Sequence, residues 1–132
     1  MREDELLEST IRSKIVRVIN SRGKGAVQIR HQGGYNKKGD PDLVGVYRKY
    51  HMEIEVKRQK NRPTRLQKER LAFWAAHGAI VAVLYSEAGA RKFIEIVDDA
   101  IDRGVIEHLN FVYDEHTGGA HPEITVIQER YH

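Results

Sequence analysis

Apolar residues near the start of the chain recur at the spacing of an α-helix. Over roughly residues 3–21 they fall on one side of a helix drawn through the sequence. The residues on this side are Leu7, Ile11, Ile15, Val18 and Ile19. Gly23 follows shortly afterwards, and glycine is favoured just past a helix end. We therefore predict an amphipathic helix that packs one face on a core.

Three short segments that follow have the character of β-strands. Residues 26–31 alternate in polarity, with Val27 and Ile29 on one face. After a loop rich in glycine and lysine, residues 43–47 and 52–58 are again strand-like. A tight polar connection joins these two strands, so we predict that they form an antiparallel hairpin.

A second helix is predicted from Pro63 and Thr64 to the glycine at position 78. Proline fits a first helical turn, and threonine is a good N-cap. One face of this helix carries several apolar and aromatic side chains, and we expect Phe73 and Trp74, at helical spacing with Leu66, to pack in the core. That face consists of Leu66, Arg70, Phe73, Trp74 and His77, with Leu71 beside it.

The next segment, residues 79–85, is continuously apolar, as in a strand that is buried on both faces. Ser86 then caps a predicted third helix that runs through about Asp102. Its inward residues are Phe93, Ile94, Val97 and Ile101. Residues 110–114 and 124–128 are strand-like and predict a C-terminal hairpin. The order α-β-β-β-α-β-α predicts an α/β fold, with a mixed central sheet flanked by helices. We expect one domain, with a core over residues 1–104 and an extension over residues 105–132.

The composition removes several classes of protein. The 132 residues suit a single domain, and 31% of them are charged. The absence of cysteine excludes disulfides, thiolate zinc sites and a cysteine nucleophile. No apolar run is long enough to span a membrane, and the first residues do not resemble a signal peptide. We expect a cytoplasmic protein with no membrane partner.

Charge is distributed unevenly along the chain. Residues 22–70 contain 14 basic and 5 acidic side chains, whereas residues 87–132 contain 4 basic and 10 acidic ones. A surface this basic attracts a polyanion, and nucleic acid is the usual one. An ordinary solvated face explains the charge alone equally well.

The middle of the chain also contains a compact set of acidic and basic side chains. In a strand over residues 52–58, alternation places Glu53, Glu55 and Lys57 on one face, followed by Gln59. Asp42 opens the neighbouring strand, where a hairpin would bring it beside Glu55. Two carboxylates and an ammonium group would then converge.

Such a cluster suits the hydrolysis of phosphodiester bonds. Carboxylate oxygens are preferred by Mg²⁺ and Mn²⁺, and a lysine can orient the attacking water. The alternative is an exposed strand face that forms ion pairs with Arg48 or Lys49. The turn made by Gly39 and Pro41, which would aim Asp42, and the basic flanks favour the metal site.

The sequence resembles the VRR-NUC branch of the PD-(D/E)xK nuclease superfamily over about residues 5–86. The resemblance rests on a set of short motifs, each weak alone. In this chain they are Glu8, Gly39-Asp40-Pro41-Asp42, Glu55-Val56-Lys57, Gln59, Gln67 and Gly78-Ala79. The family has a restriction-endonuclease-like α-β-β-β-α-β core, the same order that the hydrophobic pattern predicts.

The resemblance implies roles for individual residues. Asp42 and Glu55 would bind Mg²⁺ or Mn²⁺ with the backbone carbonyl of Val56, and Lys57 would act on the attacking water. Glu8 would lie near the metal, and Gln67 would help to shape the site. Glu3, Asp4 and Glu5 compete for the position that we assign to Glu8. The alternative roles are a helix-surface pair of Glu8 with Arg12, and a plain surface position for Gln67.

Basic and polar residues around this cluster are the expected DNA contacts. They are Lys37, Lys38, Arg58, Gln59, Lys60, Arg62 and Arg65. The loop over residues 32–39 either tracks phosphates or is a plain surface loop. His116 and His121 flank a turn and are weak candidates for a further metal site.

The sequence therefore predicts a metal-dependent DNA endonuclease, selective for structures such as junctions or flaps. The alternative is a non-catalytic DNA-binding module on the same fold. Carboxylates repel phosphates, so a module that only binds DNA has no use for Asp42 and Glu55. We also expect a homodimer formed through the C-terminal hairpin. By resemblance, a small nuclease of this kind suits phage or mobile-element DNA metabolism.

Overall fold

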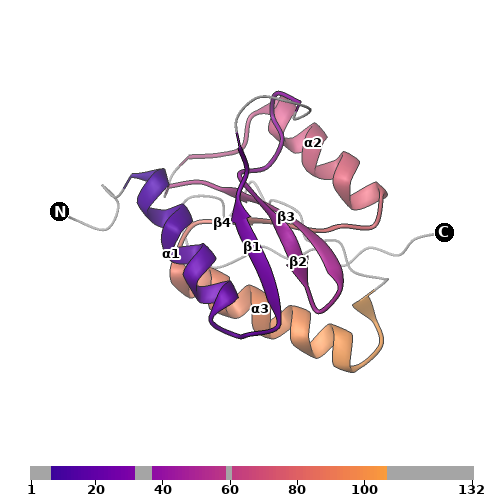
Figure 1. Ribbon diagram of the computed structural model, residues 1–132. Helices are drawn as coiled ribbons and strands as arrows, with labels where there is room; N and C mark the ends of the chain where they lie inside the picture. Colours follow the sequence, from indigo (N-terminus) through magenta and orange to yellow (C-terminus); the bar gives the residue numbers. More distant parts are fainter. Residues whose placement is uncertain (1–6, 32–36, 59–60, 107–132) are drawn as a thin grey trace.

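The structure is a computed structural model that describes residues 7–31, 37–58 and 61–106 (Figure 1). The chain folds into helices and strands in the predicted order. These elements are α1 (Glu8–Asn20), β1 (Gly25–Ile29), β2 (Leu43–Tyr47), β3 (Tyr50–Val56), α2 (Arg65–Ala76), β4 (Ile80–Leu84) and α3 (Glu87–Asp102). The prediction of a mixed α/β fold is confirmed. No helix among these described residues is long and apolar enough to cross a membrane.

The four strands form one sheet in the order β1-β2-β3-β4. Strand β2 is antiparallel to both β1 and β3, whereas β4 runs parallel to β3. In this register Leu43 lies opposite Ile54, which in turn lies opposite Ala82. The predicted hairpin of β2 and β3 is confirmed, and it places the start of β2 beside the end of β3.

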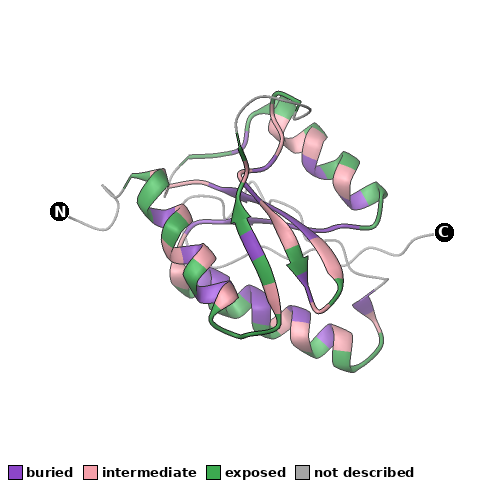
Figure 2. Cartoon of the chain, viewed as in Figure 1, coloured by how far each residue is buried: buried purple, intermediate pink, exposed green. Residues whose placement is uncertain are grey.

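The sheet is covered by helices on both faces. On one face, residues from α1 and α3 pack on Met52, Ile54 and Val56 of β3. On the other face, Leu71 and Ala75 of α2 pack on Val81 and Val83 of β4. The predicted double burial of β4 is therefore confirmed, as Figure 2 shows by its colour. Glu53 and Glu55 point to the α2 face, where the apolar cluster is small.

The tip of the β2–β3 hairpin is tied to α3. Arg48 and Lys49 both have positive φ angles, 49° and 76°, as a two-residue hairpin turn requires. The Arg48 guanidinium lies 3.1 Å from the Asp98 carboxylate and 2.7 Å from that of Asp102. Because the turn uses only two residues, β3 starts at Tyr50, and the strand ends at Val56. The predicted range of residues 52–58 was too late by two residues at each end.

Several other expectations need correction or fall outside the structure. The first helix begins at Glu8, because Leu7 is extended, with φ −68° and ψ 147°. Phe73 and Leu66 are 41% and 38% exposed, so they do not belong to the core. Ile29 is 45% exposed on the edge strand. The C-terminal hairpin and the boundary of its extension lie outside the described residues, as do His116 and His121.

Candidate active site

The two candidate metal ligands and the lysine lie together in the structure. Asp42 immediately precedes β2, and Glu55 lies on β3 next to it. The backbone N–H of Val56 donates a hydrogen bond of 3.0 Å to Oδ2 of Asp42. Nζ of Lys57 lies 3.7 Å from Oε2 of Glu55. The hairpin register therefore aligns Asp42 with the Glu55-Val56-Lys57 segment.

Both glutamates on this strand face are buried. Glu53 is 0% exposed and Glu55 is 1% exposed, so the alternative of a solvated strand face is wrong. Arg48 does not pair with these glutamates but with Asp98 of α3. Glu53 pairs with Arg30. A buried carboxylate without compensation is strongly destabilising, so this face must hold specific partners.

The negative charge of Glu55 has fewer stabilising partners than a buried carboxylate requires. Burial raises its pKa to about 9, and repulsion by Asp42 adds to the shift. Lys57 lowers the pKa of Glu55 but does not offset these two effects. Within the described residues, Oε1 of Glu55 is buried and has no hydrogen-bond partner. A divalent cation between Asp42 and Glu55 would supply the missing positive charge and use this oxygen.

The oxygen-only character of the site fits Mg²⁺ or Mn²⁺. The described residues contain no group of three or more histidine, aspartate or glutamate side chains arranged as metal ligands. Mg²⁺ commonly uses only one or two protein carboxylates and keeps several waters. The pair formed by Asp42 and Glu55 therefore fits Mg²⁺ better than an ion that needs a full cage of side chains.

Glu8 lies at the margin of this cluster. It is the first residue of α1, and its Oε1 accepts a weak hydrogen bond of 3.4 Å from Nδ2 of Asn61. Its charge also contributes to the raised pKa of Glu55, after burial and the larger effect of Asp42. Arg12 approaches Asp42, with 4.0 Å between Nη1 and Oδ1. The observed contacts thus link both residues to the site, and neither contact is the helix-surface pair considered as an alternative.

Gln67 serves as part of the α2 cap. Its side-chain oxygen accepts a hydrogen bond of 2.8 Å from the Thr64 backbone, and the Thr64 hydroxyl accepts one of 3.2 Å from the Gln67 backbone. This is a reciprocal capping box. Gln67 also lines a cavity that Asp42 borders, so it helps to form the wall beside the site.

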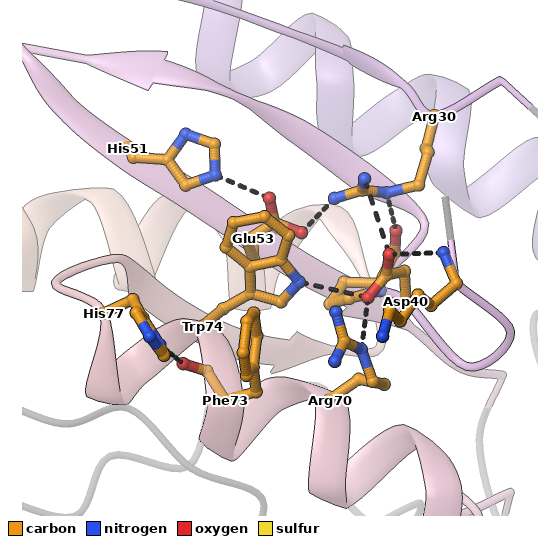
Figure 3. A network of polar contacts seen from close by, with 10 residues as sticks. Arg30, Asp40, His51, Glu53, Arg70, Phe73, Trp74 and His77 are labelled. Carbon is orange, nitrogen blue, oxygen red and sulfur yellow. Dashed lines mark hydrogen bonds and ion pairs between the residues drawn. The ribbon is translucent and has the colours of Figure 1, made fainter. Parts of the chain in front are cut away.

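A second polar network, which the sequence did not predict, surrounds Arg30 (Figure 3). Arg30 donates a side-chain hydrogen bond to Glu53 and another, of 2.9 Å, to the carbonyl of Pro41. Glu53 also contacts Nε2 of His51 at 2.6 Å. Burial raises the pKa of Glu53, while His51 and Arg30 act to lower it. Arg30 therefore connects the end of β1 to β3 and to the turn that carries Asp42.

Asp40 fixes the same turn to α2. Its carboxylate accepts hydrogen bonds of 2.7 Å from Nε of Arg70 and 3.1 Å from Nε1 of Trp74. Burial alone would raise the pKa of Asp40, but the bonds from Arg70 and Trp74 outweigh it and lower the pKa. The Arg30 backbone also donates to the Asp42 carbonyl at 2.7 Å. Asp40 is thus a positioning residue in the Gly-Asp-Pro-Asp motif, beside the candidate ligand.

The predicted DNA contacts differ in their exposure and in their surroundings. Lys37 and Lys38 are exposed and line the cavity beside Asp42. Arg58 is half-buried, and Arg62 is exposed. The Arg65 side chain is 94% exposed and pairs with Glu69 at 3.1 Å. Gln59 and Lys60 lie outside the described residues.

Comparison with known proteins gives the family. The model of the archaeal Holliday junction resolvase (Hjc) family matches residues 9–122. The chain belongs to this family. Hjc-type resolvases are nucleases of the PD-(D/E)xK type, so the chain is a nuclease that acts on DNA.

Solved structures support the fold and the predicted VRR-NUC resemblance. A structure named "VRR_NUC domain" is 26% identical to this chain, with a TM-score of 0.57, and the match covers 67% of this chain and 94% of that one. A structure named "VRR_NUC domain protein" is 17% identical with a TM-score of 0.56, covering 69% and 87%, and shows the fold alone. The search of curated proteins gave no match. The restriction-endonuclease-like fold class is thereby confirmed.

Proposed function

We propose that the chain is a divalent-metal-dependent DNA endonuclease, with Asp42, Glu55 and the carbonyl of Val56 as ligands of Mg²⁺ or Mn²⁺. The carboxylate pair formed by the buried Glu55 and the partly exposed Asp42 is the observation that carries this proposal. Both carboxylates lie in one place, one oxygen of Glu55 has no described partner, and burial raises the pKa of Glu55 to about 9. A protein that only binds DNA gains nothing from a pair of carboxylates at this position, because they repel phosphates.

The bound metal would supply Lewis-acid activation of the phosphate and lower the pKa of a bound water. The residues of the chain have the remaining tasks. Asp42 is held by the Val56 N–H and by the turn that Asp40 anchors, so its carboxylate is fixed in direction. The Lys57 ammonium, whose side chain is only 12% exposed, is placed to orient the attacking water and to stabilise developing negative charge. Glu8 would assist at the edge of the site.

We propose branched DNA, such as a four-way junction or a flap, as the substrate. The support is the family to which the chain belongs, which is that of the archaeal Holliday junction resolvases. Cutting two strands of a junction requires two active sites, and a homodimer formed through the C-terminal residues would provide them. The expected DNA contacts remain Lys37, Lys38, Arg58, Gln59, Lys60, Arg62 and Arg65.

A cleavage assay tests this function. Labelled four-way junction, flap, linear duplex and single-stranded DNA would each be incubated with Mg²⁺, Mn²⁺ or EDTA. We expect cutting of a branched substrate with either metal and none in EDTA. Asp42→Asn should abolish cutting, while Glu95→Gln, at an exposed position on α3, should leave it unchanged. Undiminished cutting in EDTA would contradict the metal mechanism, and DNA binding without any cutting would favour the binding module.

A further inference from the structure

A basic cavity adjoins the candidate metal site. It has a volume of about 580 Å³, and Asp42 forms part of its wall. The basic residues that line it are Arg12, Arg30, Lys37 and Lys38, and His31 lies beside them. A ligand in this cavity would therefore lie next to the bond that the Asp42 site is proposed to cut.

The charges around the cavity are not balanced by its own acidic groups. Arg30 is engaged by Glu53 and by the Pro41 carbonyl. Asp40 is engaged by Arg70 and Trp74, deep in the wall, where its side chain is 4% exposed. Among the described residues that line the cavity, this leaves Arg12, Lys37 and Lys38 with the carboxylate of Asp42. An anionic ligand fits this surplus of positive charge.

Arg12 is the side chain best placed to bind that anion. Its Nη1 lies 4.0 Å from Oδ1 of Asp42, beyond hydrogen-bond distance, and its side chain is 26% exposed. Its Nε is buried and, within the described residues, has no hydrogen-bond partner. A guanidinium fork with donors to spare matches the paired oxygens of a phosphate. Arg12 projects from α1, so the helix holds this fork in place.

We propose that the cavity is a phosphate subsite, in which Arg12, with Lys37 and Lys38, binds the backbone phosphate next to the scissile one. The identification of the ligand as DNA rests on the proposed function. The subsite would fix the register of the strand over the metal site, because Asp42 belongs to both. Phosphate contacts of this kind position a strand without reading its sequence.

The test is a binding experiment that needs no turnover. Four-way junctions would carry a single neutral methylphosphonate in place of one phosphate, moved linkage by linkage around the crossover. Affinity would be measured by fluorescence anisotropy in EDTA for the wild type and for Arg12→Ala. We expect one linkage at which the methylphosphonate weakens the binding of the wild-type protein by about tenfold, as the loss of a charged hydrogen bond would.

Arg12→Ala should bind the unmodified junction about tenfold more weakly. It should also be much less sensitive than the wild type to the methylphosphonate at that one linkage, because only Lys37 and Lys38 remain to contact the phosphate. The slope of log affinity against log salt should fall by about one. Lys14→Ala is the matched control, because Lys14 is on the same helix and pairs with Glu87 at 3.8 Å, away from the cavity. It should keep both the wild-type affinity and the sensitivity. Arg12→Lys, which keeps the charge but not the fork, should recover only part of the affinity.

The proposal is overturned if Arg12→Ala, shown by circular dichroism to be folded, stays as sensitive as the wild type at every linkage. It is also overturned if no linkage matters to the wild type, or if Lys14→Ala behaves like Arg12→Ala. Because binding is measured without metal, these results are separate from the cleavage result. A protein that never cuts DNA can still lose its sensitivity to the methylphosphonate when Arg12 is replaced, and an active nuclease can fail to do so.

Discussion

At the scale of single residues, the site depends on what each charged group has as a neighbour. Glu55 and Glu53 lie two positions apart on one face of β3, and both are buried. Glu53 has Arg30 and His51 as partners, whereas Glu55 has Lys57 at 3.7 Å and an acidic neighbour in Asp42. The partners of Glu53 hold the fold together, and the shortage of partners at Glu55 leaves room for a cation.

The pKa of Glu55 gives the metal-free protein a defined pH dependence of stability. In the unfolded chain this carboxyl ionises near pH 4.5, but in the folded chain its pKa is raised to about 9, first by burial and then by Asp42. Between these two pH values the folded state binds more protons than the unfolded state. The contribution of Glu55 to the free energy of unfolding therefore falls as the pH rises through this window.

Glu55→Gln should remove this part of the pH dependence. In EDTA at pH 8, the variant should unfold at a temperature higher than the wild type by roughly 4 °C or more, equivalent to about 1 kcal/mol. At pH 4 the two proteins should differ little. Thermal unfolding followed by circular dichroism at both pH values measures this. A lower midpoint for the variant at pH 8 would show that the carboxylate is stabilised in the metal-free fold.

Lys57 is expected to act on the reaction and not on the fold. Lys57→Ala should retain DNA binding and metal binding but lose turnover by about 100- to 1,000-fold, the usual effect of removing a group that stabilises a transition state. Single-turnover cleavage and anisotropy measure the two quantities. Lys92→Ala, at an exposed position on α3, is the control and should be unaffected. Equal losses of affinity and rate in Lys57→Ala would assign the residue to DNA binding.

At the scale of elements, the Gly-Asp-Pro-Asp turn is held between α2 and β1. Asp40 and Arg70 are 4% and 15% exposed at their side chains, so this ion pair is shielded from solvent. Asp40→Asn should leave the Arg70 guanidinium short of its counter-charge and lower the free energy of unfolding by about 1–3 kcal/mol. Glu69→Ala, which breaks the exposed pair with Arg65, should cost no more than about 0.5 kcal/mol.

Urea unfolding measures the stability of both variants. If Asp40 positions Asp42 as well as stabilising α2, Asp40→Asn should also weaken Mn²⁺ binding when assayed well below its unfolding midpoint. An unchanged Mn²⁺ affinity would limit Asp40 to a purely structural role.

The sequence predicted the elements well where apolar side chains alone determine them. β4 is uniformly apolar and is buried on both faces, and α3 has its apolar residues at helical spacing. The prediction failed for Phe73 because Arg70 and Trp74, on the same helix face, are used to bind Asp40. Apolar spacing does not reveal that a helix face packs against a carboxylate.

Candidate ligands were predictable because Asp42 and Glu55-Val56-Lys57 lie in short motifs and meet through one hairpin. Arg30 and Arg12 were not predictable in the same way. Their partners are separated from them in the sequence. Arg30 contacts Pro41 and Glu53, and Arg12 approaches Asp42. Such contacts depend on how β1 and α1 are placed against the hairpin, which local patterns do not specify.

At the scale of the whole molecule, the uneven charge along the chain suits a DNA-bound dimer. The basic residues 22–70 provide the turn, the hairpin and the start of α2 around the site, whereas residues 87–132 have an excess of acidic side chains. We predict that the full chain sedimenting at micromolar concentration is a dimer, and that a chain ending after residue 108 is a monomer. A monomeric full chain would contradict this assembly.

Mn²⁺ binding tests the central claim most directly. Electron paramagnetic resonance would count free Mn²⁺ in a titration of the wild type, Asp42→Asn and the control Glu69→Gln at pH 7.5. We predict that the wild type and the control bind Mn²⁺ equally, and that Asp42→Asn binds it at least tenfold more weakly, an effect of roughly 1.4 kcal/mol. Equal binding by all three proteins would contradict the assignment of Asp42 and Glu55 as the metal site.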